Sequence, residues 1–137
     1  MRVSVKHLLL SGAALLLTVA PVFAYIMAAT FGWVSVTQDL GRVRQGKPVT
    51  LSYGFTNKGT APLVITHAKG SCGCTGVEWP KEAVMPGAMG QIIATFNAAA
   101  LGTFNKSVFV ESNADEGTVT LQFKGEVVAE EGKPTGR

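Results

Sequence analysis

The only two cysteines of this chain lie one residue apart, within SCGCT at residues 71–75. Three kinds of chemistry use two thiols at this spacing: a local disulfide, a redox-active pair and a clamp for a soft metal ion. In an extended segment, residues i and i+2 point to the same side, so Cys72 and Cys74 would present their sulfurs together. Their Cα atoms would then lie about 5.5 to 7 Å apart, within or at the edge of disulfide reach.

A Cys72–Cys74 disulfide would shape a turn rather than stabilise the whole domain, because so short a loop removes little entropy from the unfolded chain. Strained or exposed disulfides are more easily reduced, which keeps a redox role open. Dithiol catalysts, however, place the attacking thiol at the start of a helix, and no helix start follows Cys72.

Two thiolates on one side of the chain also suit Cu(I), with His67 as a third metal ligand beside Cys72 and Cys74. Structural zinc takes four Cys or His ligands, which argues against zinc here. A Cys–His hydrolase would need an orienting group and an oxyanion hole, for which the sequence offers no motif. We therefore predict no cofactor and no enzymatic activity, with copper as the alternative.

An aromatic side chain follows the cysteine loop closely, at Trp79 in VEWP. It could anchor a partner, since tryptophan dominates interface hot spots. The interpretation that we favour is that it covers the end of the core, where tryptophan is readily half-buried. The candidate binding residues are Ser71, Cys72, Gly73, Cys74, Thr75 and Trp79.

The segments that must position this loop carry apolar residues at every second position, as half-buried strands do. The alternation is clearest in VTLSYGFT at 49–56, QIIATF at 91–96 and TVTLQFKG at 118–125. A strand at 63–68 would end just before the cysteine loop, with His67 on the same face as Ile65.

Further strands are expected near residues 33–37 and around Val108 and Val110, where apolar residues on both faces indicate a central strand. NADEG at 113–117 is typical of a hairpin loop. No segment after residue 32 has a helical period, so the sequence predicts an all-β antiparallel sandwich of about seven strands.

The first 24 residues have the order of a secretory signal peptide: basic residues, an apolar run at 8–20, then small residues up to Ala24. We predict cleavage after Ala24. The alternative is an uncleaved anchor helix and membrane tether, since the apolar stretch at 8–29 is about 22 residues long. The domain is then periplasmic or secreted, or membrane-anchored facing the periplasm, where disulfides persist.

The chain has 137 residues and a formal net charge of +3, to which Arg2 and Lys6 of the leader contribute. No basic stripe remains in the mature chain, so no nucleic-acid partner is predicted. About 110 residues suffice for one core, which we place in a sandwich at 33–128. The polar tail at 129–137 is predicted to be disordered.

Several short motifs together resemble one known family. They are GRV at 41–43 with Gly46, YGFTNKGTAPLVIT at 53–66, SCGCTGVEWP at 71–80, PG at 86–87, ATFNA at 94–98 and LQFKGEV at 121–127. Their order and spacing resemble a bacterial family of exported, immunoglobulin-like domains known as domain of unknown function 1573. The resemblance covers residues 34–128, and the Ser-Cys-Gly-Cys-Thr element is its most distinctive part.

The resemblance implies an immunoglobulin-like sandwich outside the cytoplasm, similar in architecture to hydin-like and major-sperm-protein-like domains, which mostly bind or scaffold other proteins. It implies no established activity. We therefore expect an exported, non-enzymatic binding or scaffolding module with an unidentified envelope protein as partner. A sheet edge or the cysteine-loop end would make the contact, by strand addition. The alternative is a copper-binding or thiol redox protein that uses Cys72 and Cys74.

Overall fold

The computed structural model of the chain describes residues 26–130, so the predicted signal peptide at 1–24 lies outside the described residues. This part of the chain consists of eight strands and contains no helix. The strands are β1 Phe31–Trp33, β2 Thr37–Arg44, β3 Val49–Asn57, β4 Ile65–Gly70, β5 Thr75–Glu78, β6 Met89–Phe96, β7 Gly102–Ser112 and β8 Val119–Val128.

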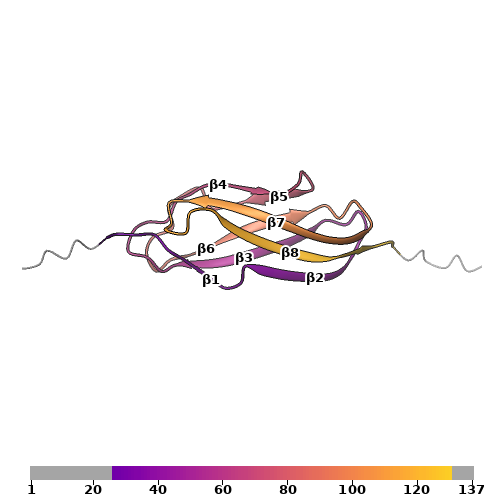
Figure 1. Ribbon diagram of the computed structural model, residues 1–137, viewed down its shortest axis with the longest axis horizontal. Helices are drawn as coiled ribbons and strands as arrows, with labels where there is room; N and C mark the ends of the chain where they lie inside the picture. The colour runs from indigo at the N-terminus through magenta and orange to yellow at the C-terminus, as the bar shows by residue number, and fades with distance from the viewer. Residues whose placement is uncertain (1–25, 131–137) are drawn as a thin grey trace, which may run out of the picture.

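The strands form two stacked four-stranded sheets (Figure 1). The first sheet has the order β1-β3-β6-β5 and the second has the order β2-β8-β7-β4. The predicted all-β, immunoglobulin-like sandwich is therefore confirmed.

One strand pair departs from the antiparallel prediction, because β2 runs parallel to β8. β1 pairs with β3 in the first sheet, and the chain then bends between Val34 and Val36. The Val34 N–H donates to the Gly54 oxygen in the first sheet, whereas the Val36 oxygen accepts from the Gln122 N–H in the second. A single segment thus changes sheet along one side of the sandwich.

The core follows the alternation seen in the sequence. β7 lies between β8 and β4, as predicted for a central strand. The predicted inward-facing residues that are buried are Leu51, Tyr53, Phe55, Ile92, Ala94, Phe96, Val108, Val110, Leu121 and Phe123.

The strand before the cysteine loop differs from its predicted position. It begins at Ile65 and ends at Gly70, and Leu63 instead forms an isolated bridge with Val84. A register shift between Ile65 and His67 breaks the alternation. His67 is therefore exposed and does not share the face of buried Ile65, as the sequence had suggested.

The domain begins before the predicted residue 33. Ala29 is buried and forms a bridge with Ala114. The Ala28 oxygen accepts from the N–H groups of Thr60 and Ala61 at 2.8 and 3.2 Å. The last residues of the apolar stretch at 8–29 thus belong to the sandwich, and within residues 26–130 no helix is long and apolar enough to cross a membrane.

Tyr53 links the two sheets. Its side chain is fully buried, and its hydroxyl donates to the Gln122 oxygen at 2.7 Å. Replacing Tyr53 by phenylalanine is expected to lower the free energy of unfolding by about 1 to 2 kcal/mol, because the Gln122 oxygen loses its donor. Urea unfolding of the two proteins at neutral pH measures this difference, and equal stabilities would contradict it.

Burial also raises the pKa of Tyr53 from 10.0 to about 12. The folded state therefore disfavours the phenolate, and the associated stability is complete below the ordinary pKa and falls as the pH rises through the folded pKa. Between about pH 8 and about pH 11 the free energy of unfolding should fall more for the native protein than for Tyr53→Phe. Urea unfolding of both proteins at the two pH values measures this.

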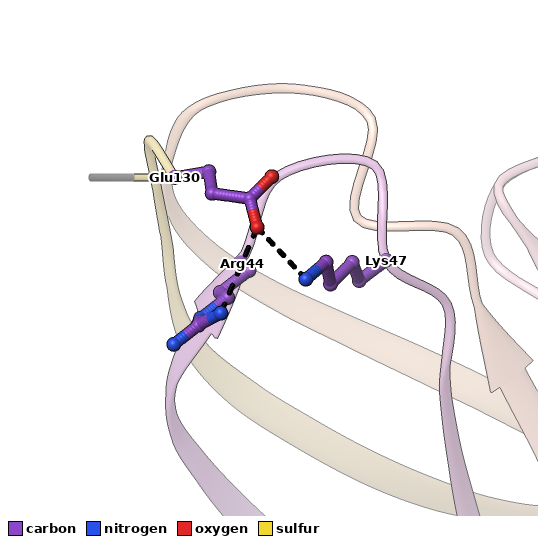
Figure 2. A network of polar contacts seen from close by, with 3 residues as sticks. All are labelled: Arg44, Lys47 and Glu130. Atoms are coloured by element: carbon purple, nitrogen blue, oxygen red, sulfur yellow. Dashed lines mark hydrogen bonds and ion pairs between the residues drawn. The ribbon is translucent and has the colours of Figure 1, made fainter. Parts of the chain in front are cut away.

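The end of β8 is held by an ion-pair network around Glu130 (Figure 2). Its carboxylate lies 2.9 Å from the Lys47 ammonium and 3.6 Å from the Arg44 guanidinium. Residues 129 and 130 were placed in the predicted disordered tail, but Glu130 contacts the connection between β2 and β3. The remainder of that tail, from residue 131, lies outside the described residues.

The hydrogen bond from Lys47 is the largest cause that lowers the pKa of Glu130, ahead of the charge of Arg44. The contribution to stability is therefore present above the ordinary pKa and is lost as the pH falls through the lowered pKa. We expect Lys47→Met to return the pKa of Glu130 toward its ordinary value more fully than Arg44→Met does. An NMR titration of the Glu130 carboxyl carbon tests this order, which an equal effect of both variants would refute.

Candidate functional site

The Cys-Gly-Cys sequence lies in the connection between β4 and β5, which are edge strands of different sheets. The chain therefore crosses between the sheets along an open side of the sandwich, and we call residues 70–75 the disulfide crossover (Figure 1). A disulfide joins Cys72 to Cys74, whose Cα atoms are 5.2 Å apart. The backbone turns here and is not extended as predicted, since the Thr75 N–H donates to the Cys72 oxygen at 3.4 Å.

Two of the candidate binding residues hold the crossover in place. The Ser71 N–H donates to the Ser107 oxygen at 2.8 Å, and the Ser107 N–H donates to the Ser71 hydroxyl at 3.1 Å. Thr75 is buried, with its hydroxyl 3.9 Å from both sulfurs. A Cβ on Gly70 would meet the Thr75 Cβ at 2.8 Å, so only glycine fits there. Ser71 and Thr75 thus position the disulfide, and Gly73 lies exposed at its tip.

A surface hollow of about 270 Å³ lies beside the disulfide and includes Cys74 in its wall. The hollow is also lined by three apolar residues and one lysine: Phe96, Leu101, Phe104 and Lys106. The two phenylalanine rings pack at 4.5 Å between centroids, and Leu101 is 57% exposed. The hollow thus combines an apolar wall with one ammonium group.

The long strand β7 has an unpaired edge beside this hollow. β8 pairs with β7 from Gly102 onward, but β4 pairs only as far as Val108, and Ser71 bonds to Ser107. The disulfide crossover then carries the chain to the other sheet. Within the described part of the chain, residues 102–106 of β7 therefore have a neighbouring strand on one side only.

Trp79 and His67 meet on the same open side of the sandwich. Their ring centroids are 5.6 Å apart in an edge-to-face arrangement, and the Lys81 ammonium lies 3.1 Å from the Trp79 ring centroid. Trp79 is half-buried against the core, in agreement with the favoured interpretation. Because His67 belongs to β4 and Trp79 follows β5, the pair bridges the two sheets.

The three residues suggested for copper are not brought together. Cys72 and Cys74 are bonded to each other, and the His67 ring lies against Trp79. Among residues 26–130 no group of three or more His, Cys, Asp or Glu side chains is arranged to hold a metal ion. Copper binding would also require reduction of the disulfide, because the thiolate is the ligand.

Sequence reasoning located the cysteines but missed the hollow and the β7 edge. In the sequence Phe96 belongs to the alternating segment QIIATF and is expected only as a core residue, and Leu101 follows a run of alanines with no strand pattern. The unpaired edge arises because β7 begins at Gly102, whereas its pairing with β4 begins only at Val108. This difference in length is a property of the folded sheet.

Replacing both Cys72 and Cys74 by serine is expected to lower the free energy of unfolding by about 1.5 kcal/mol or less, because the disulfide closes a very short loop. Urea unfolding under oxidising conditions measures the effect, and the native protein in reductant should match the double variant. A loss comparable to truncating a buried phenylalanine, about 3 kcal/mol or more, would contradict a merely local role.

Three solved structures illustrate the likeness of fold. A protein of unknown function from Porphyromonas gingivalis W83 has a TM-score of 0.65 and 12% identity, over 78% of this chain and 50% of that one. PapD-like domain 7 of human CEP192 has a TM-score of 0.64 and 13% identity, over 96% and 100%. The YadV chaperone has a TM-score of 0.53 and 11% identity, over 76% and 55%.

These identities show a common fold and no more. The chain spans about half the length of the Porphyromonas protein and of YadV. No curated protein matches the sequence.

A family model described as protein of unknown function (DUF1573) matches residues 31–127. The match runs from the first residue of β1 to the next-to-last residue of β8 and includes the disulfide crossover. It agrees with the resemblance carried by the sequence motifs. The chain therefore belongs to the DUF1573 family.

Proposed function

We propose that the domain is an exported, non-enzymatic binding module that takes an extended segment of an envelope protein onto the free edge of β7. The observation that carries the proposal is the unpaired edge at residues 102–106 beside the hollow. Strand addition satisfies such an edge with backbone hydrogen bonds, and a pocket for a side chain gives selectivity.

The direction of the backbone groups favours this edge. Ser107 exchanges hydrogen bonds with Ser71 on the β4 side, so the N–H and C=O groups of Asn105 and Thr103 point the same way. An added segment would therefore continue the line of β4 beyond the disulfide crossover. Its apolar side chains would enter the hollow, and an acidic neighbour would pair with Lys106.

The disulfide has a shaping role in this proposal. It tightens the crossover at the point where the chain leaves β7, which keeps the edge beyond Ser107 free. The likeness to YadV, which is described as a chaperone, supports a binding role only through the shared fold.

Two variants of Asn105 test the proposal. Asn105→Pro removes an N–H that points away from β8, so it blocks strand addition without breaking the β7–β8 pair. Asn105→Ala is the matched control that keeps this N–H. With a photo-crosslinking amino acid in place of Leu101, envelope extracts should give a specific adduct with the alanine variant and none with the proline variant. Equal adducts from both would overturn the proposal.

We propose the periplasm or the cell exterior as the location, on the basis of the signal-peptide pattern and of the disulfide. The intact mass of the protein purified from the envelope tests this. Loss of residues 1–24 supports cleavage, and their retention supports a membrane anchor. A mass deficit of two hydrogens would report the disulfide in the cell, and recovery only from the cytoplasm with free thiols would refute export.

A further inference from the structure

The free edge of β7 has room for a segment of only five residues. Ser71 already exchanges hydrogen bonds with Ser107, so the place opposite Ser107 is taken. The strand begins at Gly102. An added segment therefore lies opposite residues 102–106, and beyond them it must bend away from the sheet or end. Its selection depends on the side chains that it meets over this short distance.

Alternate positions of this edge face the interior of the sandwich. Lys106 and Phe104 pair with Phe123 and Gly125 of β8, and Phe123 is fully buried. Because strand side chains alternate, Lys106, Phe104 and Gly102 lie on this inward side. Gly102 carries no side chain, and a Cβ added there would meet no atom within 4 Å. The hollow, with Phe104 and Lys106 in its wall, therefore stays open beside Phe104.

The register of the backbone places these two side chains close to an added segment. The N–H and C=O groups of Asn105 and Thr103 point toward it, so Phe104 and Lys106 occupy the non-hydrogen-bonded positions of an antiparallel pair. At such positions the facing Cα atoms are about 4.5 Å apart and side-chain contacts are closest. β4 and β8 both run antiparallel to β7, and we give the added segment the same direction. Followed from its N-terminus, the segment meets Lys106 first and Phe104 two residues later.

The Phe104 ring forms a fixed wall of the hollow. Its centroid lies 4.5 Å from that of Phe96 and 6.1 Å from that of Phe123. The ring also covers Gly125, where an added Cβ would lie 2.8 Å from it. Phe104 is only half-buried, and an incoming aromatic ring can join the cluster edge-on. The hollow of about 270 Å³ is large enough, because a cavity of about 150 Å³ binds benzene.

Lys106 supplies the one charge in the wall of the hollow. The ion pairs within residues 26–130 are those of Glu130 with Arg44 and Lys47, so Lys106 has no acidic partner in this part of the chain. A carboxylate opposite Lys106 would form a charge-assisted hydrogen bond beside an apolar wall, where such a bond is stronger than in water. An acidic side chain is therefore favoured at this position over a neutral or basic one.

We propose that the segment recognised by the free edge of β7 carries an acidic residue and, two positions later, an aromatic one. The carboxylate pairs with Lys106, and the aromatic ring enters the hollow against Phe104. The residue between them faces away from the hollow and is free to vary. The inference rests on the proposed function, to which it adds the class of peptide that is bound.

Phage that display five random residues between glycine-serine flanks test the pattern on the full chain purified from the envelope. They are selected in parallel on the native protein and on Asn105→Pro, which lacks the N–H needed for strand addition. We expect the sequence acid–any–aromatic to be enriched about tenfold on the native protein, since two such contacts together change the affinity by about that factor.

The selection separates failure of the inference from failure of the proposed function. Peptides that bind the native protein but not Asn105→Pro, and that share the reverse order or no such pattern, would overturn the inference and leave strand addition intact. If no peptide distinguishes the two proteins, both the inference and the proposed function fail.

Two variants assign the halves of the pattern to their residues. On Lys106→Glu the preference at the first position should change from Asp and Glu to Lys and Arg, with the aromatic preference retained. On Phe104→Leu the aromatic preference should be lost and the acidic one retained. The retained half shows in each case that the variant is folded and binds at the same edge. An unchanged preference in either variant would overturn the proposal.

Fluorescence anisotropy with one selected peptide measures the size of each contact. Replacing its aromatic residue by leucine should weaken binding about fivefold, at low and at high salt alike. Replacing its acidic residue by the neutral amide should weaken binding about threefold at low salt and less at high salt, because salt screens the ion pair. Equal affinities of all three peptides would contradict recognition by these side chains.

Discussion

Replacing Asn57 by leucine is expected to lower the free energy of unfolding by about 3 to 5 kcal/mol, because several buried polar groups lose their partners together. The Asn57 side chain is fully buried. Its amide group donates to the oxygens of Ala61 and Val84 at 2.8 and 2.9 Å, and its oxygen accepts from the Gly59 N–H at 2.9 Å. Leucine has a similar volume but satisfies none of these groups.

Asn113 provides the matched control. Like Asn57, it joins loop backbones. Its side-chain amide donates to the Pro62 oxygen, and its side-chain oxygen accepts from the Val64 N–H, but Asn113 is exposed. Water can replace its hydrogen bonds, so Asn113→Ala should cost about 1 kcal/mol. Urea unfolding compares the two, and similar losses for both variants would show that burial of Asn57 is not the decisive factor.

Gly59→Ala is expected to cost about 3 kcal/mol or more, because the added methyl group would overlap backbone atoms of Ala28, Ala29 and Thr30. Backbone cannot move aside as a flexible side chain does. Relief requires residues 28–30 to leave the domain, with loss of the hydrogen bond from the Lys58 N–H to the Thr30 oxygen at 2.9 Å.

Hydrogen exchange distinguishes this mechanism from general destabilisation. In Gly59→Ala the Asp115 N–H, which donates to the Ala29 oxygen, should lose protection well before the core strands do. Gly76→Ala is the control, since a Cβ at Gly76 meets no atom within 4 Å. Normal stability of Gly59→Ala, or protection lost evenly over all strands, would contradict the predicted displacement.

The fold was predictable where a strand has one buried face. In β3, β6 and β8 apolar residues recur at every second position, apart from Ile93 on the opposite face of β6 and Gly125 within the series of β8, and the structure buries the predicted side chains. β2 was incompletely predicted because the register shift between Asp39 and Arg42 breaks its period. β5 was missed because Thr-Gly-Val-Glu is too short to show any period.

The candidate site was predictable only in its cysteines. Spacing identified Cys72 and Cys74 as a pair, but the bulge that turns His67 toward Trp79 has no signature in the sequence. Asn57 directly follows the alternating segment at 49–56, and its role as a buried hub depends on loops distant in sequence. Such features depend on which strands become neighbours, which local patterns do not specify.

Because β2 pairs in parallel with β8, the first long strand of the domain cannot form its pairing in the second sheet until the last strand has been synthesised. While a ribosome is still synthesising residues 119–128, β2 has no strand to join in the second sheet. Assembly must therefore follow completion of the polypeptide, and closure of such distant contacts is slow, on the order of milliseconds to seconds. Until then the second sheet can consist only of β7 and β4, and β2 has no strand to pair with.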